Sequence, residues 1–60
     1  MIPDVEADTV ARELIEKHGP FAPSEAAQRA QRMQTRGDQY GTAHWLRIKK
    51  IVEKLLADAR

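Results

Sequence analysis

The chain has 60 residues, no cysteine and a formal net charge of +1. Its length allows one small domain, and the absence of cysteine excludes a disulfide framework and a thiolate metal site. No apolar run approaches the roughly 20 residues that span a bilayer, and the N-terminus lacks the basic flank and the apolar stretch of a signal peptide. We therefore expect a cytoplasmic protein that does not bind a membrane.

Hydrophobic residues make up 42 % of the chain, but nine of them are alanines. A buried alanine contributes little compared with the roughly 1.5–3 kcal/mol of a large aliphatic side chain. Domains of this size usually need a disulfide, a metal or a partner subunit for stability. We therefore expect the chain to associate with itself.

The first predicted helix covers residues 4–18. Its inner positions recur every three or four residues and fall within an arc of about 140°, the width of a buried helical stripe. They are Ala7, Val10, Ala11, Leu14, Ile15 and His18. Gly19 followed by Pro20 predicts the helix end, because glycine adopts the left-handed position there and proline cannot continue the hydrogen-bond ladder. Phe21, in the connection, is expected to plug one end of the core.

The second predicted helix covers residues 23–36. Its start is ambiguous, because Ala22 could precede Pro23 as the first helical residue or Ser24 could cap the helix. Its inner stripe is mostly small, which allows a close approach of a neighbouring helix. The stripe consists of Ala22, Ala26, Ala30 and Met33, and Gly37 ends the helix.

The third predicted helix, residues 38–59, begins with Asp38 as its cap and carries the richest apolar arc. The arc contains His44, Trp45, Ile48, Ile51, Val52, Leu55 and Leu56, with Gly41 and Ala59 near its centre. We interpret Gly41 as the point where two helices cross closely. Short connections favour antiparallel neighbours. The sequence thus predicts a single all-α domain, residues 1–60, with three helices arranged up-down-up, the last of which overshoots the other two.

No pattern indicates an enzyme or a metal protein. His18 and His44 lack a metal-ligand spacing and have no cysteine partner, and we interpret both as residues at the boundary of the core. The sequence also lacks a nucleophile next to a base and a phosphate-binding loop. We therefore expect no catalytic residue, no metal, no cofactor and no small-molecule substrate.

Charge is unevenly distributed along the chain. Residues 1–18 carry five acidic side chains against Arg12 and Lys17, a balance of −3, whereas residues 19–36 and residues 37–60 carry +2 each. We interpret this distribution as complementarity within the chain together with matching to the helix dipoles. A basic half that binds anions is the alternative.

Two rows of basic side chains lie on the second and third helices: Arg29, Arg32 and Arg36, then Arg47, Lys50 and Lys54. Such rows neutralise phosphates, and arginine reads guanine edges, so a nucleic-acid-associated regulator is the alternative function. Glu25 and Glu53 interrupt the rows, however. A helix-turn-helix alignment also fails, because it puts Ile15 where a small residue belongs and Glu25 where an aliphatic one belongs. We favour solvent-facing surfaces.

The favoured function is a small non-enzymatic interaction or regulatory protein that binds another macromolecule, either a second copy or a protein partner, through a helical surface. The overshooting end of the third helix would leave an apolar patch that a two-fold contact can bury. We interpret Trp45 first as a core anchor and, because tryptophan is common in interfaces, as a candidate interface residue. The expected interface residues are Trp45, Leu46, Ile51, Val52, Leu55, Leu56 and Ala59. In the competing view, Phe21 and the first connection cover this end within one chain.

The positions of the glycines and core residues resemble a group of small bacterial proteins, common in alphaproteobacteria and classed only as a domain of unknown function. The resemblance extends from Thr9 to Leu56. It rests on Ala11, Leu14, Ile15, His18, Gly19, Ala26, Arg29, Ala30, Gly37, Asp38, Gly41, Trp45, Ile48, Ile51 and Leu55. Because that group has no assigned activity, the resemblance implies the helical fold and no function.

Overall fold

The structure, a computed structural model, describes residues 3–58 and the side chains of residues 6–58. Its elements in chain order are α1 (Pro3–His18), the 3-10 helix η1 (Gly19–Phe21), α2 (Ala22–Thr35) and α3 (Gln39–Asp58). The predicted all-α class is confirmed, and residues 3–58 contain no strand. None of these helices is long and apolar enough to cross a membrane.

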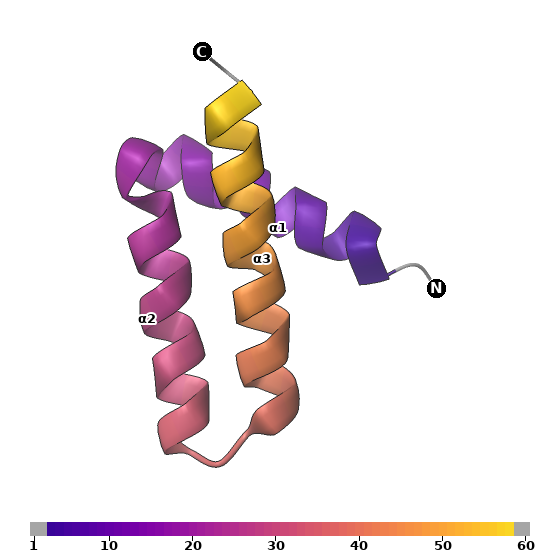
Figure 1. The fold of residues 1–60 in the computed structure, drawn as a ribbon, viewed down its shortest axis with the longest axis vertical. Coiled ribbons are helices and arrows are strands. Elements are labelled where there is room, and N and C mark those ends of the chain that lie inside the picture. Colours follow the sequence, from indigo (N-terminus) through magenta and orange to yellow (C-terminus); the bar gives the residue numbers. More distant parts are fainter. Residues whose placement is uncertain (1–2, 59–60) are drawn as a thin grey trace.

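The arrangement of the helices differs in part from the expected up-down-up order. As predicted, α2 and α3 form an antiparallel hairpin, but α1 crosses one face of it instead of lying alongside (Figure 1). Gly19 ends α1 with a φ of 55°, and η1 then leads directly into α2. Because no loop separates these elements, the chain turns a corner, and α1 covers the half of the hairpin that contains the start of α2 and the end of α3.

Two local motifs form the turn between α2 and α3. Gly37 has a φ of 78°, its N–H donates to the Gln34 carbonyl at 3.0 Å, and the Asp38 N–H donates to the Met33 carbonyl at 2.8 Å. These bonds satisfy the last carbonyls of α2. Asp38 Oδ1 accepts a hydrogen bond from the Gly41 N–H at 2.8 Å, which confirms the predicted cap of α3.

The structure shows where α2 begins, which the sequence left open between Pro23 and a cap at Ser24. The helix begins at Ala22, with Pro23 in its first turn, where the missing N–H of proline costs no helical hydrogen bond. The preceding residue, Phe21, makes no capping hydrogen bond through its side chain. Ser24 therefore lies inside the helix and does not cap it.

The core combines small side chains from α1 and α2 with larger ones from α3. The buried residues are Ala7, Ala11, Leu14, Ala22, Ala26, Ala30, Ile48 and Val52. Ile48 and Val52 are the largest fully buried side chains, and the alanines let the neighbouring backbones approach them closely. The predicted burial of Leu14, Ile48 and Val52 is confirmed, whereas Leu55 is only half-buried.

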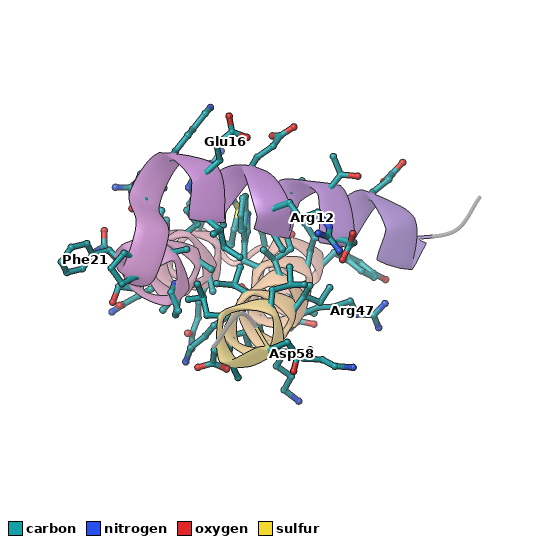
Figure 2. All side chains as sticks on the ribbon, turned by 90° about the horizontal axis from the view of Figure 1, so that it is seen from above. Arg12, Glu16, Phe21, Arg47 and Asp58 are labelled. Atoms are coloured by element: carbon teal, nitrogen blue, oxygen red, sulfur yellow. The ribbon has the colours of Figure 1, made fainter. Side chains whose placement is uncertain are left out.

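Two sequence expectations about burial are wrong. The Phe21 side chain is 72 % exposed and points away from the helices (Figure 2), because η1 lies at a corner of the molecule. It therefore plugs no end of the core. His44 falls inside the apolar arc of the sequence, but its side chain is exposed, while His18 is half-buried. The first turns of α3, which include His44, lie in the half of the hairpin that α1 does not cover (Figure 1).

Candidate functional site

Two surface grooves contain most of the residues that the sequence predicts to be functional. The first, the α1–α3 groove, consists of two hollows of about 410 and 330 Å³ that share Leu55. From α1 it is lined by Asp8, Arg12, Ile15 and Glu16, and from α3 by Arg47, Lys50, Ile51, Lys54, Leu55 and Asp58. Figure 2 shows Arg12 of α1 and Arg47 of α3 on the same side of the molecule.

The floor of the α1–α3 groove is apolar and its rim is charged. Ile15, Ile51 and Leu55 are half-buried and pack against the core. On the rim, Arg12 Nε contacts Asp8 Oδ2 at 2.8 Å in an exposed pair. Such a pair contributes little stability by itself, so the rim side chains are available to a partner at small cost.

The second groove, the arginine–tryptophan groove, has a volume of about 780 Å³. Its lining comes from α2, the residue that directly follows it, Arg36, and a single residue of α3. The lining residues are Gln28, Arg29, Gln31, Arg32, Met33, Thr35, Arg36 and Trp45. The predicted row Arg29, Arg32 and Arg36 and the only tryptophan of the chain thus belong to one site.

Arg29 joins the two helices at this groove. Its guanidinium carbon lies 5.0 Å from the centre of the Trp45 ring system, within the range of a cation–π contact. Its Nε also donates to Glu25 Oε1 at 3.1 Å. The side chain of Arg29 is therefore held in place, and it covers one face of the indole.

Sequence reasoning missed the pairing of Trp45 with the arginine row, although the signal was present. An antiparallel hairpin that turns at Gly37 places residue 45 opposite residues 29 and 30. The close approach of Met33 to Gly41 has the same register: a β-carbon on Gly41 would lie 2.9 Å from Met33 Cγ. The turn therefore determines which residues of α2 meet Trp45.

The predicted interface residues do not form one surface. Trp45 lines the arginine–tryptophan groove, whereas Ile51 and Leu55 line the α1–α3 groove. Leu46 is 45 % exposed and faces a separate hollow beside Gln34 and Thr42. Val52 is fully buried, because α1 and α2 pack around it, so it offers no surface to a partner. Leu56 is half-buried, and Ala59 lies outside the described residues.

The two predicted basic rows lie in different surroundings. Arg47, Lys50 and Lys54 line the α1–α3 groove together with Asp8 and Asp58. In contrast, no acidic residue among those that the structure describes lines the arginine–tryptophan groove, although Glu25 contacts Arg29 beside it. Within the described part of the chain, no group of three or more histidine, cysteine, aspartate or glutamate side chains is placed to hold a metal ion.

No protein-family model, curated protein or solved structure matches the chain. The resemblance to the small alphaproteobacterial proteins therefore gains no support from known proteins.

Proposed function

We propose that the protein is a small non-enzymatic interaction protein that pairs with a second copy of itself through the α1–α3 groove. The observation that supports this is the row of half-buried aliphatic side chains, Ile15, Ile51 and Leu55, in a groove between two diverging helices. In the described residues, no further helix covers this row. Self-association would bury it and enlarge a core whose largest fully buried side chains, among the described residues, are Ile48 and Val52.

The charges on the rim favour a second copy over a partner of one charge sign. The α3 side carries Arg47, Lys50 and Lys54 with one acid, Asp58, and is net basic. The α1 side carries Asp8 and Glu16 with one base, Arg12, and is net acidic. In a two-fold contact whose axis runs along the groove, each α3 side faces the α1 side of the other subunit. Opposite charges then meet at both edges of the contact, whereas a uniformly acidic or basic partner would be repelled at one edge.

We expect the association to be weak and reversible. The three aliphatic side chains are already partly buried, so each gains less than the roughly 1.5–3 kcal/mol of full burial. Association also costs translational and rotational freedom. A dissociation constant between about 1 mM and 1 µM is consistent with such a contact.

Sedimentation velocity over a concentration series tests the proposal. The wild-type mass should rise with concentration, and Leu55→Glu should keep the protein monomeric. Leu46→Glu places the same charge on an exposed leucine outside the groove and is the matched control. Leu55→Glu also risks unfolding the protein, so a second variant changes two exposed side chains. Lys50→Glu/Lys54→Glu should also stay monomeric, and circular dichroism checks that it is folded. A wild-type monomer at the highest soluble concentration would contradict the proposal.

Nucleic-acid binding is the alternative function, and the structure offers it less support. In one basic row Arg29 is engaged by Glu25 and Trp45, and the other row lies beside Asp8 and Asp58. A cytoplasmic location, which the cysteine-free sequence favours, is part of the same proposal.

A further inference from the structure

The arginine–tryptophan groove points to a second binding activity, independent of self-association. Most of its lining residues belong to the second half of α2, the residue that follows it and the first half of α3, and these segments lie in the half of the hairpin that α1 leaves uncovered (Figure 1). Arg29, Arg32 and Arg36 follow one another at intervals of three and four residues, so they form a row of roughly 10 Å along α2 at 1.5 Å per residue. Met33 and Trp45, both half-buried, supply an apolar wall beside the row.

The positive charge of the groove favours an acidic binding partner. Arg32 and Arg36 are exposed, and within the described residues their guanidinium groups have no ion-pair partner. Among the described residues, three arginines and no acid line the groove. A guanidinium group binds a carboxylate through two parallel hydrogen bonds, so two free guanidinium groups on one helix face provide two such sites side by side.

We propose that this groove binds an acidic amphipathic α-helix of a partner protein. A helix that lies along α2 presents carboxylates at intervals of three and four residues, the same spacing as the arginine row. Two of its carboxylates bind Arg32 and Arg36. An apolar side chain between them packs against Met33 and Trp45, where thioethers and aromatic rings suit an irregular apolar contact.

The same features disfavour nucleic acid at this site. Single strands usually bind through bases stacked on exposed aromatic rings, but the guanidinium group of Arg29 already covers one face of the Trp45 ring system. Glu25, whose carboxylate contacts Arg29, would repel a phosphate brought to that end of the row. A partner helix avoids both obstacles, because it needs only Arg32, Arg36 and the apolar wall.

Fluorescence of Trp45, the only tryptophan, provides a direct readout with the full chain. The probe is a synthetic helical peptide without tryptophan, with glutamates at positions i and i+4, the spacing of Arg32 and Arg36, and leucine between them. We expect a saturable change in emission. The same peptide with glutamine in place of glutamate should bind at least tenfold more weakly, and a single-stranded oligonucleotide of equal charge should bind more weakly than the acidic peptide.

Two charge-matched variants locate the site. Arg32→Gln/Arg36→Gln removes two exposed guanidinium groups from the groove and should weaken peptide binding by about tenfold or more. Lys50→Gln/Lys54→Gln removes the same charge from the α1–α3 groove and should leave peptide binding unchanged. Because the two grooves are separate, peptide binding tests this inference whether or not the protein dimerises.

Several results would overturn the inference. They are no binding of the acidic peptide, equal losses in the two variants, or tighter binding of the oligonucleotide. Self-association of the wild type that disappears in Arg32→Gln/Arg36→Gln would also overturn it. That outcome would identify the acidic α1 of a second copy as the occupant of the groove.

Discussion

Gly41 stabilises the hairpin by leaving room for two neighbouring side chains. A β-carbon at this position would lie 2.7 Å from Asp38 Oδ2 and 2.9 Å from both Cγ and Sδ of Met33. These separations are too short, so Gly41→Ala requires both side chains to move. The carboxylate that moves is the one that caps α3 through the Gly41 N–H.

Favourable and unfavourable free-energy contributions together determine how much Gly41→Ala changes the stability. Replacing glycine by alanine in a helix is favourable by up to about 1 kcal/mol. Loss of an N-cap costs about 0.5–2 kcal/mol, and forcing extra volume into a packed site costs about 1–3 kcal/mol. Because Met33 is flexible and half-buried, we take the lower end of the packing cost, about 1 kcal/mol, and a typical cap cost of about 1 kcal/mol. The expected result for Gly41→Ala is a net loss of about 1 kcal/mol, or a fall in melting temperature of roughly 4–8 °C.

A double-mutant cycle separates these contributions. Asp38→Ala alone should cost about 1 kcal/mol through loss of the cap. In that background, Gly41→Ala no longer displaces a capping carboxylate, so it should change the stability little. The two substitutions should therefore be non-additive by about 1 kcal/mol. Urea denaturation followed by circular dichroism measures all four proteins. A Gly41→Ala protein that is more stable than the wild type, or strictly additive costs, would refute the close contact at this position.

Three further substitutions test the burial pattern and the turn by thermal or urea denaturation. Leu14→Ala removes a side chain that is 3 % exposed and should lower the unfolding free energy by about 2–5 kcal/mol. Leu55→Ala removes a half-buried side chain and should lower it clearly less. Equal losses would show that the two sites are packed alike. Phe21→Ser should change the unfolding free energy by no more than about 0.5 kcal/mol, because its side chain is largely in solvent; a large loss would restore Phe21 as a core residue. Gly37→Ala should cost about 1–2 kcal/mol, since its φ of 78° is strained for any residue with a β-carbon, and Gly37→Asn should cost less; a neutral alanine variant would mean that the turn tolerates another conformation.

The sequence by itself determined the helices and where they end. Gly19 with Pro20, and Gly37 with Asp38, act through backbone conformation and local hydrogen bonds, which need no information about distant residues. The same holds for the periodic apolar positions, which identified Leu14, Ile48 and Val52 as core. The arginine row of α2 was also visible, because residues three and four apart share a helix face.

Only the tertiary structure decided how these helices face one another. The 3-10 turn at Gly19–Phe21 sends α1 across the hairpin, and this path leaves His44 and Phe21 in solvent although their neighbours in the sequence are apolar. Periodicity defines the apolar face of a helix, but it does not say which part of that face a neighbour covers. The pairing of Trp45 with Arg29, and the distribution of the predicted interface over separate surfaces, depend on register and crossing geometry, which are set by the packing of side chains far apart in the sequence.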